Sequence, residues 1–114
     1  MTPAAPTDPV LTPAMYLILL ALLEGDRHGY AIMQSVESLT AGSTRLGPGT
    51  LYGSIRKMIE AGLIEETGER PDPQLDDERR RYYRIAAAGR KAVTAETDRL
   101  DRLVAHARPY LRAV

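Results

Sequence analysis

Residues 46–65, with the sequence LGPGTLYGSIRKMIEAGLIE, constrain the fold of this chain more than any other segment. Gly47 can occupy the N-cap of a helix and Pro48 its first position, where a missing backbone N–H costs nothing. Apolar side chains then recur on one helical face, and Gly62 is suited to end the helix before an apolar strand. The segment therefore predicts a short helix that buries one side and leaves the other open.

The two faces of this predicted helix differ in composition. The buried face is expected to carry four apolar side chains, which are Leu51, Ile55, Met58 and Ile59. The opposite face carries small and charged residues, which are Thr50, Gly53, Arg56, Lys57 and Glu60. A slim exposed surface with two cations suits a recognition helix, which enters the DNA major groove by its N-terminal end.

Two helices are predicted before this segment. Thr12 followed by Pro13 indicates a helix start, and this apolar first helix should run to about Glu24, with Gly25 as its stop. Because it is apolar nearly all round, it is expected to lie in the core or in a subunit interface. The second helix should begin within residues 26–29 and continue to about residue 39.

A β-hairpin is predicted after the segment. Residues 63–67 and 80–85 have the composition of strands, and a loop rich in Pro, Asp and Gly joins them. The order helix, helix, helix, strand, loop, strand, helix is that of a winged helix-turn-helix. The sequence therefore predicts a mainly α fold with a small β-hairpin.

Residues 87–111 predict a long helix of a different character. Its apolar positions recur mostly at intervals of seven and form one stripe, which comprises Val93, Leu100, Leu103, Val104, Ala107 and Leu111. The stripe is sparse for a domain core, so we expect a helix from a second copy to cover it, as in a coiled coil. The alternative is that it packs on the first helix of the same chain. Pro109 is expected to end or bend this helix just before the terminus.

The 114 residues divide into three predicted parts. Residues 1–11 form a flexible Pro-rich N-terminal arm, residues 12–86 the winged helix-turn-helix domain, and residues 87–114 a C-terminal dimerisation helix. The longest apolar run, residues 14–23, is too short to span a bilayer, and the N-terminus does not resemble a signal peptide. We therefore expect a soluble protein with no membrane partner. The chain has no Cys, which is compatible with the reducing cytoplasm, where we expect it to lie.

The distribution of charge favours contact with nucleic acid, and the absence of catalytic motifs argues against an enzyme. The formal net charge is zero, but residues 79–91 contain six cations and no acid, which suits local contact with nucleic acid. No nucleophilic Cys, Walker-type loop or Ser/His/Asp pattern is present, so we do not expect an enzyme. His28 and His106 are the only histidines, and His28 is expected to start a helix. We therefore expect no metal and no cofactor.

A winged helix that contacts another protein is the main alternative to DNA binding. Such a protein would usually show exposed apolar anchors on the face that carries Arg56 and Lys57, and the sequence predicts none there. The sequence therefore favours double-stranded DNA as the partner.

Three segments together resemble the PadR family of transcriptional regulators: HGYAIMQSV (28–36), GPGTLYGSIRKMIEAGLIE (47–65) and RRRYYRIAAAG (79–89). The resemblance runs from about Met15 to Lys91, and the last helix fits the short subfamily with one C-terminal helix. It implies a homodimeric repressor of operator DNA, in which the third helix enters the major groove and the wing contacts the backbone or minor groove. It also allows a small, often aromatic, effector between the first and last helices, for which Tyr16 and Tyr110 are candidates.

The resemblance and the residues together give ten expected DNA contacts, which are Pro48, Gly49, Thr50, Tyr52, Gly53, Arg56, Lys57, Arg79, Arg80 and Arg81. The Tyr52 hydroxyl could meet a phosphate, or the ring could lie at the edge of the core. The three consecutive arginines could contact phosphates or pair with the acids of residues 76–78. Family members usually have Ser, Pro and Thr where this chain has Gly47, Gly53 and Ala86, and the first two departures bear on specificity.

Overall fold

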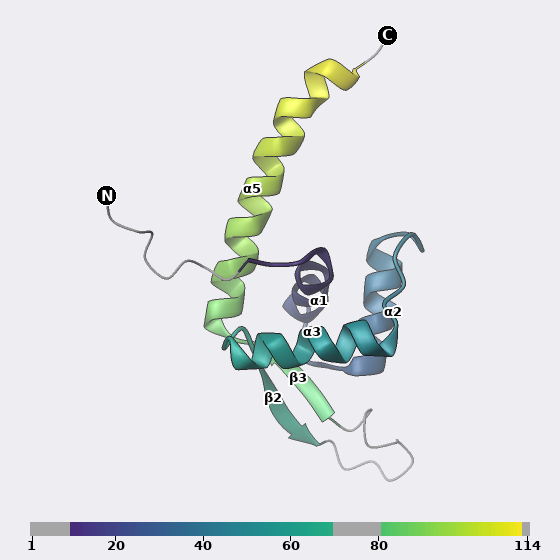
Figure 1. Cartoon of the computed structure of the whole chain (residues 1–114), viewed down its shortest axis with the longest axis vertical. Coiled ribbons are helices and arrows are strands. Elements are labelled where there is room, and N and C mark those ends of the chain that lie inside the picture. The colour runs from purple at the N-terminus through teal and green to yellow at the C-terminus, as the bar shows by residue number, and fades with distance from the viewer. Residues whose placement is uncertain (1–9, 70–80, 113–114) are drawn as a thin grey trace, which may run out of the picture.

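The computed structural model describes residues 10–69 and 81–112, and its elements follow the predicted order with one additional short strand (Figure 1). They are α1 (Pro13–Leu23), β1 (Arg27–His28), α2 (Gly29–Leu39), α3 (Pro48–Glu60), β2 (Ile64–Glu69), β3 (Arg81–Ile85) and α5 (Ala87–Leu111). The architecture is mainly helical with a small antiparallel sheet and a long C-terminal helix, which confirms the predicted fold class. Most of the predicted arm, most of the acidic loop, and Arg79 and Arg80 lie outside the described residues.

Local signals at the helix ends explain why the first boundaries were predictable. The Thr12 hydroxyl accepts a hydrogen bond from the Met15 N–H at 3.1 Å and caps α1. Gly25 and Gly62 have positive φ angles of 148° and 77°, a conformation that glycine adopts without the steric cost of a Cβ. The N-cap of α3 is Gly47, which supplies no capping side chain.

The sheet has three strands in the order β1-β3-β2, and not the two strands of the predicted hairpin. The additional strand, β1, pairs antiparallel with β3, with Arg27 opposite Tyr83 and His28 opposite Tyr82. Two residues are too few to show the alternation that marks a strand in sequence, so only the tertiary pairing defines β1.

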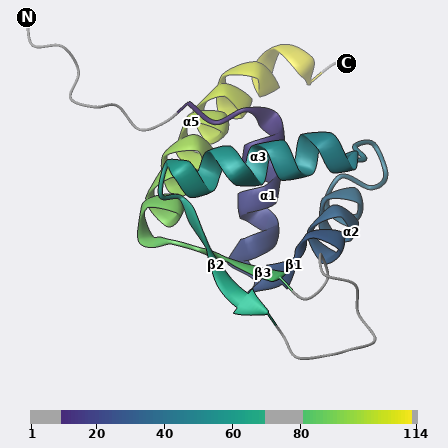
Figure 2. The same ribbon diagram turned by 60° about the horizontal axis from the view of Figure 1, so that its bottom comes forward.

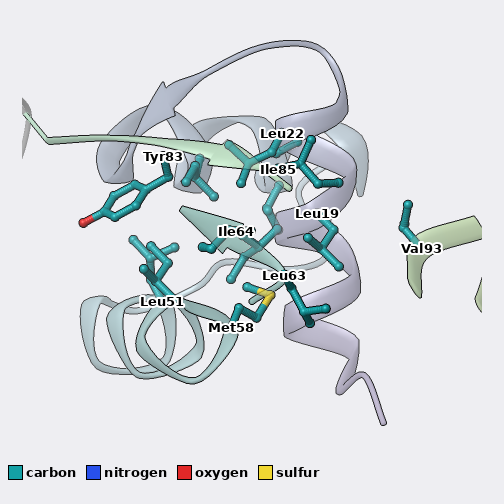
Figure 3. Packing of buried hydrophobic residues seen from close by; sticks show 14 of the residues in the cluster. Leu19, Leu22, Leu51, Met58, Leu63, Ile64, Tyr83, Ile85 and Val93 are labelled. Carbon is teal, nitrogen blue, oxygen red and sulfur yellow. The ribbon is translucent and has the colours of Figure 1, made fainter. Parts of the chain in front are cut away.

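The hydrophobic core is built around α1, which contacts α2, α3, α5 and β3 (Figures 2 and 3). Ile18, Leu19 and Ala21 of this helix have no exposed surface. Leu22 of α1 is also buried. The remaining core side chains come from the other helices, the sheet and the turn before β2: Ile32, Val36, Leu51, Ile55, Met58, Leu63, Ile64, Tyr83, Ile85, Ala92 and Val93. The core role predicted for α1 is therefore confirmed.

One position on α3 differs from the predicted amphipathic pattern. Leu51, Ile55 and Met58 are buried, but Ile59 is 38% exposed and Ser54 is buried in its place. The helix turns by about 100° per residue, so Ile59 is rotated away from the line through Leu51 and Met58 while Ser54 lies on the core side.

The last helix, α5, begins in the core and then extends away from the domain (Figure 1). Val93 is only 3% exposed and packs in the core of its own chain, so its assignment to the dimer interface was wrong. Pro109 does not end the helix, which continues to Leu111, because near a helix end a proline removes little of the hydrogen-bond ladder. Within the described ranges, no helix is both long and apolar enough to cross a membrane.

Candidate nucleic-acid interface

The start of α3 is open and narrow. Pro48, Gly49 and Thr50 are all exposed there. A Cβ added at Gly49 or Gly53 would meet no atom within 4 Å, so neither glycine is required by packing inside the domain. Figure 2 shows α3 lying across the face of the domain in front of α1. A helix exposed in this way can approach a groove by its first turns.

Two cations follow on the exposed side of α3. Arg56 and Lys57 are both exposed. Among the described residues, no carboxylate lies within ion-pair distance of either side chain. Both charges are therefore available to a phosphate or to a base edge.

Tyr52 has a different environment from its neighbours on α3. Its side chain is half-buried and packs against the core. The ring and hydroxyl lie so close to Gly29, the first residue of α2, that a Cβ at Gly29 would overlap them. This geometry supports the core-edge alternative for Tyr52, and its phosphate contact remains a prediction.

The described part of the wing carries one of the three predicted arginines. Arg81 is exposed on β3, and its Nε lies 3.8 Å from Oε1 of Glu66 on β2. Exposed pairs at this separation contribute little stability, so Arg81 can exchange Glu66 for a phosphate at small cost. The acids of residues 76–78, which were its alternative partners, lie outside the described residues.

A further cation near the start of α3 was not predicted as a contact. The Arg45 side chain is 80% exposed, and its Nε lies 2.7 Å from Oε1 of Glu37 on α2. Its place two residues before the N-cap Gly47 was the signal that could have identified it.

On β3, the exposed Arg84 pairs with Asp26 at 3.2 Å and so links the sheet to the segment before β1.

His28 caps α2, as expected of a residue at a helix start. Its Nδ1 accepts a hydrogen bond from the Ala31 N–H at 3.0 Å, so the proton of the neutral ring is on Nε2. The ring also meets Tyr82 of β3 edge-on, with centroids 5.3 Å apart. The same side chain thus fixes the start of α2 and contacts the sheet.

Replacing His28 with Ala should lower the free energy of unfolding by about 1 kcal/mol, because the Ala31 N–H loses its capping acceptor. His28→Asn keeps a capping oxygen and should retain most of that stability. Urea denaturation of the two variants measures the difference. Equal loss in both would assign the effect to the ring contact with Tyr82 and remove the capping explanation.

The predicted interface residues of α5 that follow the buried Val93 divide into two groups. Leu103, Val104 and Leu111 are 52%, 44% and 74% exposed, which is high for leucine and valine. Leu100 and Ala107 are half-buried. The exposed apolar surface therefore lies on the half of α5 that extends away from the domain.

The two effector candidates are not brought together within one chain. The Tyr16 hydroxyl is 2.8 Å from the Thr97 hydroxyl, between α1 and α5. Tyr110 is 80% exposed near the far end of α5. A hollow of about 310 Å³ lies beside Tyr16.

At the rim of this hollow Arg99 donates two hydrogen bonds to Glu96, which lower the pKa of Glu96 and raise the pKa of Arg99.

The model of the transcriptional regulator PadR-like family matches residues 18–95 of this chain. An uncharacterized 37.1 kDa protein of a Streptomyces fradiae transposon is 33% identical over 90 residues, covering 79% of this chain and 24% of the relative. Uncharacterized protein X of Lysinibacillus sphaericus is 33% identical over 75 residues, covering 65% of each chain. The chain thus spans less than two thirds of the length of both relatives.

Solved structures of regulators share the fold. A PadR family transcription regulator from Clostridium difficile has a TM-score of 0.71 at 21% identity, covering 88% of this chain and 99% of that one. A transcriptional regulator from Clostridium thermocellum has a TM-score of 0.70 at 22% identity, covering 89% and 98%.

Proposed function

Because this chain belongs to the PadR-like family of transcriptional regulators, we propose that it is a homodimeric repressor that binds a specific DNA operator. The family and the winged-helix fold support a DNA-binding regulator and not an enzyme. The observation that carries the proposal is the surface of α3. Its start is exposed and narrow, and Arg56 and Lys57 point away from the core with no described carboxylate beside them.

The contacts divide by chemistry. Thr50 and Arg56 lie on the exposed side of α3 and would meet base edges, since an Arg in the major groove can bond guanine with both of its terminal nitrogens. Lys57, Arg45 and Arg81 would meet phosphates, which supply most of the affinity and make it depend on salt. In a two-fold dimer the two α3 helices would lie about one DNA turn, roughly 34 Å, apart.

The alternative, a winged helix that contacts a protein, lacks a surface of the right kind. On the exposed side of α3 the large apolar side chain is Ile59, which lies at the C-terminal end and not at the open start. Protein interfaces are centred on buried aromatic and apolar anchors. Ile59 lies one turn beyond Arg56, and the described residues at the open start of α3 offer no apolar anchor.

Hydroxyl-radical footprinting on the DNA upstream of the protein's own gene tests the binding mode. Two protected half-sites about one turn apart are expected. A single short footprint would argue against the two-fold arrangement.

An effector that lies between α1 and α5 would act by favouring one spacing of the two α3 helices, and it would remove both footprints together.

Leu103→Asp combined with Val104→Asp should convert the protein to a monomer, because two charges would replace the exposed apolar surface of α5. Light scattering measures the mass. The affinity for the operator should fall when the mass falls to that of a monomer. The matched control is Ala105→Asp, an exposed neighbour on the other side of the helix. A double variant with the mass of the wild type would reject this interface.

A further inference from the structure

The exposed half of α5 separates its charges along its length. Residues 96–101 contain three acids, Glu96, Asp98 and Asp101, and one cation, Arg99. The charged residues of 102–112 are three cations, Arg102, Arg108 and Arg112, beside one histidine. A segment with opposite net charges at its two ends complements a copy of itself that runs in the opposite direction.

The charges also lie on defined sides of the apolar stripe. At about 100° per residue, Asp101, Arg108 and Arg112 fall on one flank of the line through Leu100 and Leu111, whereas Asp98 lies almost opposite that line. We call Asp101, Arg108 and Arg112 the mixed flank. The other flank carries Arg99, Arg102 and His106. Arg99 is already bonded to Glu96 at 2.6 and 2.8 Å.

The apolar stripe is covered at one end by the same chain. Val93 is buried in the core, and Thr97 is hydrogen-bonded to Tyr16 of α1. Beyond Thr97 the stripe is exposed at Leu103, Val104 and Leu111, at 52%, 44% and 74%. Among the described residues, the large exposed apolar side chains of α5 that a partner helix could cover therefore all follow Thr97.

We propose that this part of α5 pairs antiparallel with the same helix of a second copy, with the two-fold axis level with Ala105. Asp101 and Arg108 are four and three residues from Ala105, so the two come to nearly the same level on the paired helices. A two-fold axis perpendicular to both helices places like flanks together. Asp101 of one mixed flank then faces Arg108 of the other, and symmetry repeats the pair.

The apolar positions fit the same register. Leu103 and Ala107 are each two residues from Ala105, and Leu100 and Tyr110 are each five residues from it. The partner helix would end opposite Asp98, next to Thr97, where the cover from α1 begins. The overlap is about 22 Å long at 1.5 Å per residue.

A parallel pair fits less well for two physical reasons. It would bring the α1 helices of both copies to the same level between the two α5 helices, because α1 covers the stripe near Thr97. It would also place Arg108 and Arg112 opposite the flank of Arg102 and His106, where the described residues supply no acid at that level.

The inferred register deepens the proposed homodimer and depends on it. Its consequence is selectivity, since the short apolar overlap gives limited affinity while the paired charges discriminate between partners. A chain without an acid and an arginine at these positions could not form the reciprocal ion pairs, so it would pair poorly with this chain.

Charge reversal tests the register. Asp101→Arg alone and Arg108→Asp alone should each weaken the homodimer about tenfold or more, because each creates two like-charge contacts. Mixing the two variants should restore a one-to-one heterodimer, and Asp101→Arg with Arg108→Asp in one chain should restore the homodimer. The control, Arg102→Asp, alters the other flank and should leave the mass unchanged. Sedimentation equilibrium measures these five samples and the wild type.

The outcomes separate the two proposals. A wild type that is monomeric at every concentration would overturn the homodimer, and the register with it. A dimeric wild type whose single variants remain dimeric, or whose mixture stays monomeric, would overturn only the antiparallel register. Weak single variants with rescue in both the mixture and the double variant would support it.

Discussion

Replacing Arg56 and Lys57 together with Ala should weaken operator binding by about 2 kcal/mol or more, roughly thirtyfold, while the protein stays folded and dimeric. Both side chains are exposed and neither contributes to the core, so the loss falls on DNA contacts. Lys57 is expected to meet a phosphate, and Arg56 a base edge. The slope of log affinity against log salt should therefore fall by about one.

The control for this variant must change the net charge equally. Arg102→Glu also removes two units of positive charge, at an exposed position on α5 that is distant in sequence from α3. It should leave operator binding within about twofold of the wild type. If both variants bind the operator equally weakly, the electrostatic field of the whole protein, and not α3, determines the affinity for DNA. If the Arg56 and Lys57 variant binds normally, α3 is not the recognition helix.

The second large effect concerns stability and the position of α5. Gly89→Ala should lower the free energy of unfolding by about 1 to 3 kcal/mol, as expected when a methyl group is forced into a packed site. A Cβ at Gly89 would overlap the backbone carbonyl of Leu63 and the side chain of Ile85. A backbone atom cannot rotate away, so α5 would have to shift as a unit.

Gly53→Ala is the matched control, since Gly53 also lies in a helix but faces open space. It should raise the free energy of unfolding by about 0.5 to 1 kcal/mol, because alanine loses less backbone entropy than glycine. Urea denaturation measures both variants. A Gly89→Ala variant as stable as the wild type would contradict the close packing of α5 on Leu63.

The sequence predicted the helix boundaries well because local chemistry sets them. Thr12 caps α1 through its own side chain, and Gly62 takes the positive φ that ends α3. The buried face of α3 followed from helical periodicity at Leu51, Ile55 and Met58. These signals depend only on residues within one or two turns of each other.

Features that depend on distant segments were missed. The two-residue strand β1 exists only because β3 pairs with it. Val93 shares the heptad spacing of Leu100, yet the domain core covers the first and leaves the second half-buried. The close contact between Tyr52 and Gly29 joins α3 to α2, and no local pattern predicts it.

Fluorescence anisotropy tests the central proposal most directly. The DNA immediately upstream of the protein's own gene is compared with a scrambled duplex of the same composition across a salt series. Tighter binding to the upstream DNA, as a dimer and with a steep dependence on salt, is the predicted result. Equal affinity for both duplexes at every salt concentration would contradict a sequence-specific regulator acting at that site.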